Sequence, residues 1–312
     1  MKKRAFTLVE MVMVIVVLGV VAMIGTNIIT HMYEGYVRSR VVNKLQADSE
    51  LILDQISKRL QYRIKDSTVA SIGGKLSTYL KLNSLSLTKD YDVLEWIGYD
   101  NEGLVGEWDG RRFSGWSGFI DIDNNKTTNL FFVTNGSNLN NVKNIIDDLS
   151  YNSVDLNSKN GGAAIIFKCS HNNSVASYGY LGPSHSKVFT VFKKSKNELA
   201  FDNPLSLMEY CEHYRLVWSA YAIAPENITD AKDASGKIIK DAAGNTIKDF
   251  DLYLYYDYQP WQNERFKSGK KALIAKHVST FRFIQVGSTV RIKLCLRDTT
   301  TKYGFCKERA VY

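Results

Sequence analysis

The chain begins with an apolar stretch that constrains everything after it. Residues 6–29 contain a single charged residue, Glu10. As a continuous helix this stretch would be about 36 Å long, at ~1.5 Å per residue, which is enough to cross a hydrocarbon core of about 30 Å. Lys2, Lys3 and Arg4 lie immediately before it and favour a cytoplasmic amino terminus. We therefore expect one transmembrane helix over residues 6–29, with the remaining residues on the opposite side of the membrane.

The carboxyl group of Glu10 is the one charge within this predicted span. An unpaired charge at the centre of a membrane helix costs roughly 2.5–3.5 kcal/mol on insertion scales, and less near the end of the helix. Two interpretations follow from the residue alone. Either Glu10 is protonated or reaches the headgroups, or its carboxylate has a partner.

Residues 2–10, Lys-Lys-Arg-Ala-Phe-Thr-Leu-Val-Glu, resemble the leader and first helix of the type IV pilin superfamily, whose pattern is Lys-Lys/Arg-x-Gly-Phe-Thr-Leu-Val/Ile-Glu. The resemblance implies that a prepilin peptidase cuts between Ala5 and Phe6 and methylates Phe6. It also implies that Glu10 pairs with the freed amino group of a neighbouring subunit, an ion pair that would fix the register between subunits. Ala5 stands where the family nearly always has glycine.

A secretory signal peptide is the competing interpretation of the same residues. Its basic region would be Lys-Lys-Arg, and its cleavage site would follow the small residues Val20-Val21-Ala22. A carboxylate inside the apolar region argues against this interpretation, and so does the helical pattern that continues beyond the supposed cut.

An amphipathic helix over residues 30–66 is predicted to continue the span. Apolar residues recur there at steps of three, four and seven positions, with charged residues between them. A break near Gly35 would instead give two helices. The apolar positions are Val41, Leu45, Ile52, Ile56, Leu60 and Ile64.

Residues 67–312 are predicted to form a mostly-β domain. Short segments rich in aromatic and branched residues alternate with Gly, Asn and Asp, as is typical of strands joined by turns. The predicted strands include residues 76–80, 93–99, 118–122, 129–133, 161–167, 187–192, 214–222, 251–257, 272–284 and 287–296, and a short helix is expected over 139–149. The fold class is therefore α+β: a long amino-terminal helix, half transmembrane and half amphipathic, packed on antiparallel sheets as in pilins.

The predicted organisation is a leader over residues 1–5, the span over 6–29, the amphipathic helix over 30–66 and a periplasmic domain over 67–312. An inserted arm at about 225–250 contains an eight-residue repeat, Asp233–Lys240 followed by Asp241–Lys248. Glycine after small residues predicts successive β-turns with short strands there. The order Val278-x-x-Phe281-x-Phe283, then Val290-Arg-Ile-x-Leu, is similar to the terminal hairpin of J-type minor pseudopilins and W-type minor pilins.

Four cysteines, Cys169, Cys211, Cys295 and Cys306, all lie in the predicted periplasmic part. An oxidising compartment and an even count favour two disulfides. The short step between Cys295 and Cys306 suits a clamp on a terminal hairpin, which would leave Cys169 for Cys211, although the sequence alone does not fix the connectivity. His171 and His213, each two residues from a cysteine, give only a weak indication of zinc.

The chain lacks the motifs of common enzymes: it has no Gly-x-Ser-x-Gly elbow, no His-Glu-x-x-His, no phosphate loop and no dinucleotide fingerprint. We expect no enzymatic activity, no cofactor and no metal. The acidic run at residues 121–125 departs from a calcium loop at Lys126 and Phe132 and is interpreted as a polar turn, with looser calcium binding left open. The aromatic residues Trp108, Phe113 and Trp116 are either packing residues or a sugar-binding platform.

Two functions from different classes agree with these observations. The first is a minor pseudopilin or minor pilin, a structural subunit that initiates or tips a periplasmic fibre of type II secretion or a type IV pilus. The alternative is a ligand-binding minor pilin that contacts DNA or a surface, since the formal net charge is +8 and the pI is near 9.1. The implied partners are the prepilin peptidase, other pilin or pseudopilin subunits and the inner membrane, with nucleic acid a weaker expectation. The implied topology is a single bacterial inner-membrane pass with a periplasmic carboxy-terminal domain.

Overall fold

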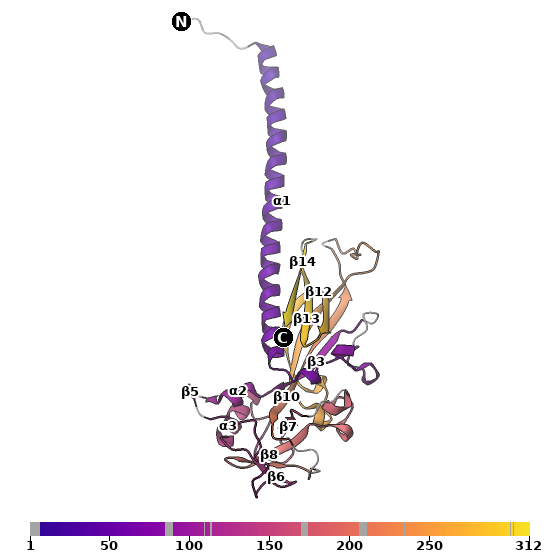
Figure 1. Cartoon of the computed structure of the whole chain (residues 1–312). Helices are drawn as coiled ribbons and strands as arrows, with labels where there is room; N and C mark the ends of the chain where they lie inside the picture. The colour runs from indigo at the N-terminus through magenta and orange to yellow at the C-terminus, as the bar shows by residue number, and fades with distance from the viewer. Residues whose placement is uncertain are drawn as a thin grey trace.

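One helix dominates the computed structural model of the chain, which describes residues 7–84, 90–108, 110–112, 114–169, 174–205, 211–233, 235–299, 301 and 303–312. Helix α1 (Leu8–Gln61) contains 54 residues and projects far beyond the folded domain (Figure 1). The helix is continuous through Gly35, so the alternative of two separate helices is wrong. No proline occurs before Pro183, and no backbone hydrogen bond of α1 is therefore lost to one.

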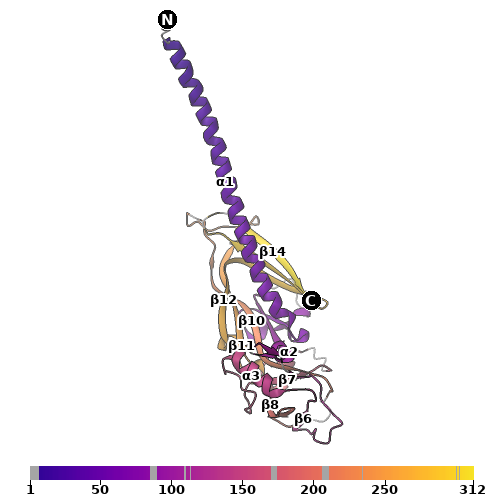
Figure 2. The same ribbon diagram turned by 90° about the vertical axis from the view of Figure 1, so that its left-hand side faces the viewer.

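The two halves of α1 have different surroundings. Its buried residues all lie in the carboxy-terminal half and recur at steps of one, three or four positions, which places them on one face. That face packs on the sheet of the folded domain (Figure 2). The buried residues are Leu45, Ser49, Ile52, Leu53, Ile56 and Leu60.

The folded domain is built on one large antiparallel sheet. Along its main path the strand order is β14-β13-β12-β11-β10-β7-β8-β9-β6, and β3 pairs with both β1 and β10, while β1 also pairs with β2. Helix and sheet together give the predicted α+β class. The strands are β1 (Val69–Ser71), β2 (Leu80–Lys81), β3 (Val93–Tyr99), β6 (Phe131–Val133), β7 (Ala164–Phe167), β8 (Phe189–Ser195), β9 (Glu198–Phe201), β10 (Tyr214–Asp230), β11 (Lys248–Tyr258), β12 (Lys270–Val286), β13 (Thr289–Arg297) and β14 (Gly304–Val311).

Smaller elements complete the described part of the chain. A separate ribbon joins β4 (Glu107–Trp108) to β5 (Arg111–Arg112), and two short helices are α2 (Asn101–Val105) and α3 (Leu139–Ser150). Helix α3 confirms the helix expected over 139–149. The 3₁₀ turns are η1 (Lys65–Ser67), η2 (Leu76–Thr78), η3 (Leu82–Ser84), η4 (Ala176–Tyr178), η5 (Pro183–His185), η7 (Pro260–Gln262) and η8 (Phe266–Ser268).

Residues 100–213 form a distal lobe between β3 and β10. The two strands pair with each other, with Tyr99 opposite Val217, so the lobe leaves and re-enters the sheet at one place. Its buried cluster includes Phe132 and Ile146 of the lobe and is shared with Tyr214 of β10. The lobe lies at the end of the molecule farthest from the amino terminus (Figure 1).

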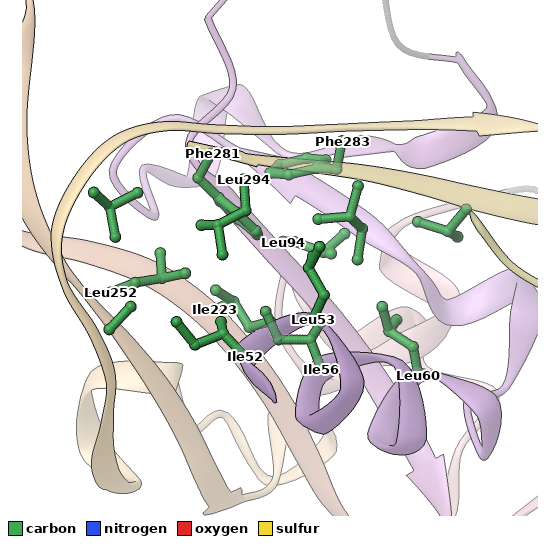
Figure 3. Packing of buried hydrophobic residues seen from close by; sticks show 14 of the residues in the cluster. Ile52, Leu53, Ile56, Leu60, Leu94, Ile223, Leu252, Phe281, Phe283 and Leu294 are labelled. Atoms are coloured by element: carbon green, nitrogen blue, oxygen red, sulfur yellow. The ribbon is translucent and has the colours of Figure 1, made fainter. Parts of the chain in front are cut away.

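The buried cluster nearest α1 joins the helix to β3 and to β12 of the sheet. Leu53 and Ile56 of α1 meet Leu94 of β3, and Phe281 and Phe283 of β12 belong to the same cluster (Figure 3). Each of these side chains is less than a tenth exposed. The burial of such apolar surface, at roughly 25 cal/mol per Å², is what holds the second half of α1 against the domain.

The arm between β10 and β11 forms two turns of the same design. Asp233 Oδ1 accepts hydrogen bonds from the N–H groups of Ser235 and Lys237, and Asp241 Oδ1 accepts from those of Ala243 and Asn245. Each turn is closed by a β-bridge, Lys232 to Ile238 and Lys240 to Thr246. The sequence repeat is thus also a structural repeat, and the prediction of successive turns is confirmed.

Two predicted strands are wrong. Residues 76–80 mostly form η2, because the Thr78 hydroxyl accepts from the N–H of Ile72 and donates to the carbonyl of Lys75, which closes a tight turn. Residues 118–122 contain only an isolated bridge between Phe119 and His213. Gly118 has a φ of +72°, a conformation that interrupts an extended strand.

Candidate functional site

The amino-terminal half of α1 has no packing partner within the described chain. From Leu8 to Ile29, every large apolar side chain is at least 49% exposed. The most apolar window of α1 has a mean hydropathy of 2.7, and none of that window is buried. By length and composition α1 is able to cross a membrane, whose hydrocarbon would cover the apolar surface that the protein leaves exposed.

Hydroxyl groups within this half are satisfied by the helix itself. The Thr26 hydroxyl donates to the carbonyl of Ala22 at 2.8 Å, and the Thr30 hydroxyl donates to the carbonyl of Thr26 at 2.9 Å. Such bonds to the preceding turn remove the cost of placing a free hydroxyl in hydrocarbon.

Glu10 lies in the first turn of α1, three positions after Thr7, the residue that caps the helix. Thr7 is extended, with φ −80° and ψ 150°, and its side chain accepts a hydrogen bond from the N–H of Glu10 at 3.4 Å. Among the described residues, none gives the exposed carboxylate of Glu10 a hydrogen bond or an ion pair. Acidic residues are favoured at this end of a helix by its dipole, and Glu10 is placed where a cation can reach its carboxyl group.

Ala5 and Phe6 lie outside the described residues, so the predicted cleavage between them and the methylation of Phe6 stay predictions. The described chain starts at Thr7, and helical structure starts at Leu8. The predicted first residue of the processed chain is therefore two positions before the helix.

The structure contains two disulfides. Cys169 is joined to Cys211, which links the chain just after β7 to the chain just before β10, with 6.3 Å between their Cα atoms. Cys295 is joined to Cys306 across β13 and β14, with 4.0 Å between their Cα atoms. The first bridge links two segments within the distal lobe, and the second links the two strands of the carboxy-terminal hairpin.

The other candidate sites of the sequence take structural roles. Asp121 Oδ2 accepts hydrogen bonds from the side-chain amides of Asn124 and Asn135, which makes the acidic run a polar turn. Trp116 is buried and its indole N–H donates to the carbonyl of Asp100, so it is a packing residue. The side chain of Trp108, and the residues Phe113 and His171, lie outside what the structure describes. Within its described part, no three His, Cys, Asp or Glu side chains are grouped to hold a metal ion.

Two buried carboxyl groups in the folded domain were missed by sequence reasoning. Burial raises the pKa of Glu95 to about 7, although hydroxyl groups of Tyr79 and Tyr258 donate to it and oppose the shift. Burial also raises the pKa of Asp100 to about 7, against the opposing hydrogen bonds from Gly103 and Trp218. The signal for Glu95 was its position inside the otherwise apolar run Val93–Ile97, whose residues are all buried.

Comparison with known families supports the interpretation of the amino terminus. Residues 1–26 match the family model described as the prokaryotic N-terminal methylation motif. Comparisons with curated proteins and with solved structures give no match for the chain. The match supports a type IV pilin-like amino terminus, as residues 2–10 implied, and a motif of this kind implies processing by a prepilin peptidase and assembly with other pilins.

Proposed function

We propose that the chain is a minor pseudopilin or minor pilin, a structural subunit that initiates or tips a periplasmic fibre. The observation that carries the proposal is the carboxylate of Glu10, which no described residue pairs with, in the first turn of a helix whose amino-terminal half has no buried residue. Helix-to-helix assembly within a membrane and a fibre would cover this carboxylate and the apolar surface around it.

The distal lobe supports a terminal position in the fibre. It adds residues 100–213 at the end of the molecule away from α1's exposed half (Figure 1). A subunit repeated along a fibre has neighbours above and below it, and a lobe at this end would stand where the next subunit packs. At the tip the same lobe meets no subunit above it.

The charge distribution bears on the alternative function, a ligand-binding minor pilin. Residues 100–213 contain 10 Lys and Arg against 13 Asp and Glu, so the net positive charge of the chain comes from residues outside the distal lobe. Nucleic-acid binding needs clustered basic side chains, because neutralised phosphates supply most of the affinity. If the lobe binds a ligand, a surface is therefore a better candidate than DNA.

We also propose that the chain has an inner-membrane anchor, a periplasmic domain and no catalytic activity.

Processing of the amino terminus tests this proposal. Co-expression with a prepilin peptidase is expected to remove residues 1–5 and leave one methyl group on Phe6, as measured by intact-protein and peptide mass spectrometry. The variant Ala5→Gly, which restores the usual family residue, is the matched control and should be processed at least as fast. An amino terminus that stays intact in both proteins, or a cut after Ala22, would refute the assignment.

A further inference from the structure

Residues 30–44 of α1 lie between the apolar stretch that ends at Ile29 and the first buried residue of the helix, Leu45. Tyr33 and Tyr36 are 67% and 61% exposed in this segment. At ~1.5 Å per residue they lie ~6 and ~10 Å beyond Ile29 along the helix axis. A headgroup layer extends ~5–8 Å beyond each side of the hydrocarbon core. If the hydrocarbon ends near Ile29, both tyrosines are therefore close to the headgroups, where tyrosine is enriched in membrane proteins.

Two basic residues continue the line of the tyrosines along the helix. Tyr33, Tyr36, Arg40 and Lys44 follow one another at steps of three, four and four positions, which places them within about 80° of one another around the axis. Arg40 and Lys44 are also exposed. Among the described residues, none gives any of these four side chains a hydrogen bond, an ion pair or a ring contact. We call this exposed line of residues the Tyr-Arg face.

Acidic side chains do not neutralise the Tyr-Arg face. Residues 30–44 contain three Lys and Arg residues against one acidic residue, Glu34. Glu34 is about 120° from Arg40 around the helix, and its carboxylate lies 3.9 Å from His31. The next carboxylate along the helix, that of Asp48, is ~12 Å farther from the span than Arg40 is. The charges of the face are thus available to an anion from outside the chain.

The folded domain approaches the opposite side of the helix and leaves the Tyr-Arg face open. The guanidinium of Arg38 lies over the ring of Tyr303, 5.8 Å from its centroid, within the range of a cation–π contact. Arg38 and Arg40 are about 160° apart around the helix. Strand β14, which follows Tyr303, begins at the end of the domain nearest the exposed half of α1 (Figure 1). The contact with Arg38 therefore fixes this end of the domain beside α1 without covering Arg40.

The spacing on the Tyr-Arg face suits a phosphate. Tyr36 and Arg40 are one helical turn apart, with ~5–6 Å expected between their Cβ atoms, so the phenol O–H and the guanidinium can donate to the same phosphate group. Ile29 and Met32, on the membrane side of Tyr36, are 68% and 70% exposed and offer apolar surface to acyl chains. We propose that the Tyr-Arg face binds an anionic phospholipid, with its phosphate between Tyr36 and Arg40.

The charge of the face selects the kind of lipid. A zwitterionic headgroup brings a cation of its own close to Arg40 and Lys44, and no acidic residue on this face compensates for it. An anionic headgroup brings only the negative charge that these residues attract. The site requires that α1 crosses a membrane, as proposed above, and it is independent of any role in a fibre.

Native mass spectrometry of the detergent-solubilised full-length chain tests the site. The probes are phosphatidylglycerol and phosphatidylcholine with the same acyl chains, titrated separately. We expect phosphatidylglycerol to bind about tenfold more tightly than phosphatidylcholine. Arg40→Gln should weaken phosphatidylglycerol binding about fivefold and Tyr36→Phe, which removes only the hydroxyl group, about threefold. Lys159→Gln makes the same change of charge at an exposed position of the distal lobe and should alter binding less than about twofold.

Three results would overturn the proposal. They are equal binding of the two lipids, equal effects of Arg40→Gln and Lys159→Gln, and displacement of phosphatidylglycerol by an equal concentration of inorganic phosphate, which would make this a site for free anions. Circular dichroism of each variant shows whether it is folded, and the comparison of the two lipids on the unmodified chain needs no variant. Phosphatidylglycerol binding by a chain whose amino terminus is never processed would support the lipid site and refute the pilin assignment alone.

Discussion

Two glutamates of this molecule lie in apolar surroundings, and only one of them has hydrogen-bond partners among the described residues. Glu95 is 1% exposed, and it receives hydrogen bonds from Tyr79 Oη at 2.5 Å and Tyr258 Oη at 3.0 Å. Glu10 lies among exposed apolar side chains of α1, and no described residue contacts its carboxylate. The folded domain thus provides hydrogen-bond donors for the carboxyl group of Glu95, whereas the described part of α1 provides none for the carboxyl group of Glu10.

The difference follows from what each region can reach. A sheet brings residues distant in sequence together, and Glu95 and Tyr258 meet across the fold although 163 positions separate them. A single helix offers its side chains only neighbours three or four positions away, and the residues around Glu10 are apolar. The described part of the chain therefore offers Glu10 no partner of opposite charge.

The largest expected effect is on assembly. Glu10→Ala should lower the amount of subunit recovered in sheared fibres about tenfold or more, since removing one member of a buried ion pair costs roughly 3–5 kcal/mol. Membrane insertion should not change. The control is Glu34→Ala, which removes an exposed carboxylate of the same helix that lies 3.9 Å from His31. If both variants enter fibres as well as the unmodified chain does, Glu10 has no pairing role.

The next effect is on the free energy of unfolding of the periplasmic domain. Leu53 is 1% exposed and Leu51 is 60% exposed on the same helix. Leu53→Ala should lower this free energy by about 2–5 kcal/mol, because it leaves a cavity in the core, whereas Leu51→Ala should change it by less than about 0.5 kcal/mol. Denaturant unfolding of the detergent-solubilised chain, followed by tryptophan fluorescence, measures both. Equal losses would mean that α1 does not pack on the sheet through the Leu53 face.

The smallest effect concerns the pH dependence of stability. The pKa of Glu95 is raised from 4.5 to about 7 by burial, so the folded state binds its proton more tightly than the unfolded state does. Its contribution to stability is therefore complete below pH 4.5 and is lost as the pH rises through 7, by roughly 3 kcal/mol in all. Asp100, whose pKa is also raised to about 7, acts in the same direction.

The variant Glu95→Gln isolates the contribution of Glu95 to the pH dependence of stability. This variant should lose less stability than the unmodified chain between pH 5 and pH 8, because the share of Glu95 is removed and that of Asp100 remains, as measured by denaturant unfolding at each pH. Glu308→Gln, which changes an exposed glutamate, is the control and should follow the unmodified chain. Parallel pH profiles for Glu95→Gln and the unmodified chain would show that Glu95 does not titrate in this range.

The sequence predicted those parts of the fold that depend on local pattern. The unbroken apolar run and the spacing from Val41 to Leu60 predicted a continuous helix, because helical neighbours are three and four positions apart. The predicted end at residue 66 was too late, since α1 ends at Gln61 and Ile64 lies outside it. The apolar pattern of residues 214–222 and 251–257 predicted β10 and β11, because successive side chains of a strand point to opposite faces of the sheet. The failures at 76–80 and 118–122 occurred where a threonine side chain or a glycine of positive φ replaced a strand with a turn.

Long-range pairing could not be read from the sequence. Nothing local in β3 indicates that Trp96 lies opposite Tyr221, and the distal lobe and its separate core depend on that pairing. The tyrosine partners of Glu95 could not be predicted either, because they also come from distant positions in the sequence. Glu10 could be identified from the sequence because its argument needs only the residues beside it, and its pairing with a neighbouring subunit stays a prediction.

The insertion of the distal lobe between two paired strands also makes the molecule modular. Because Tyr99 and Val217 are neighbours in the sheet, the path between them can be short or long without altering the ladder that joins β3 to β10. The strand β7 and the buried side chains of Tyr178, Tyr180 and Val188 are the exceptions, because they pair or pack with β3, β10 and β11. Loops of the lobe that make neither contact can lengthen or shorten at little cost in free energy.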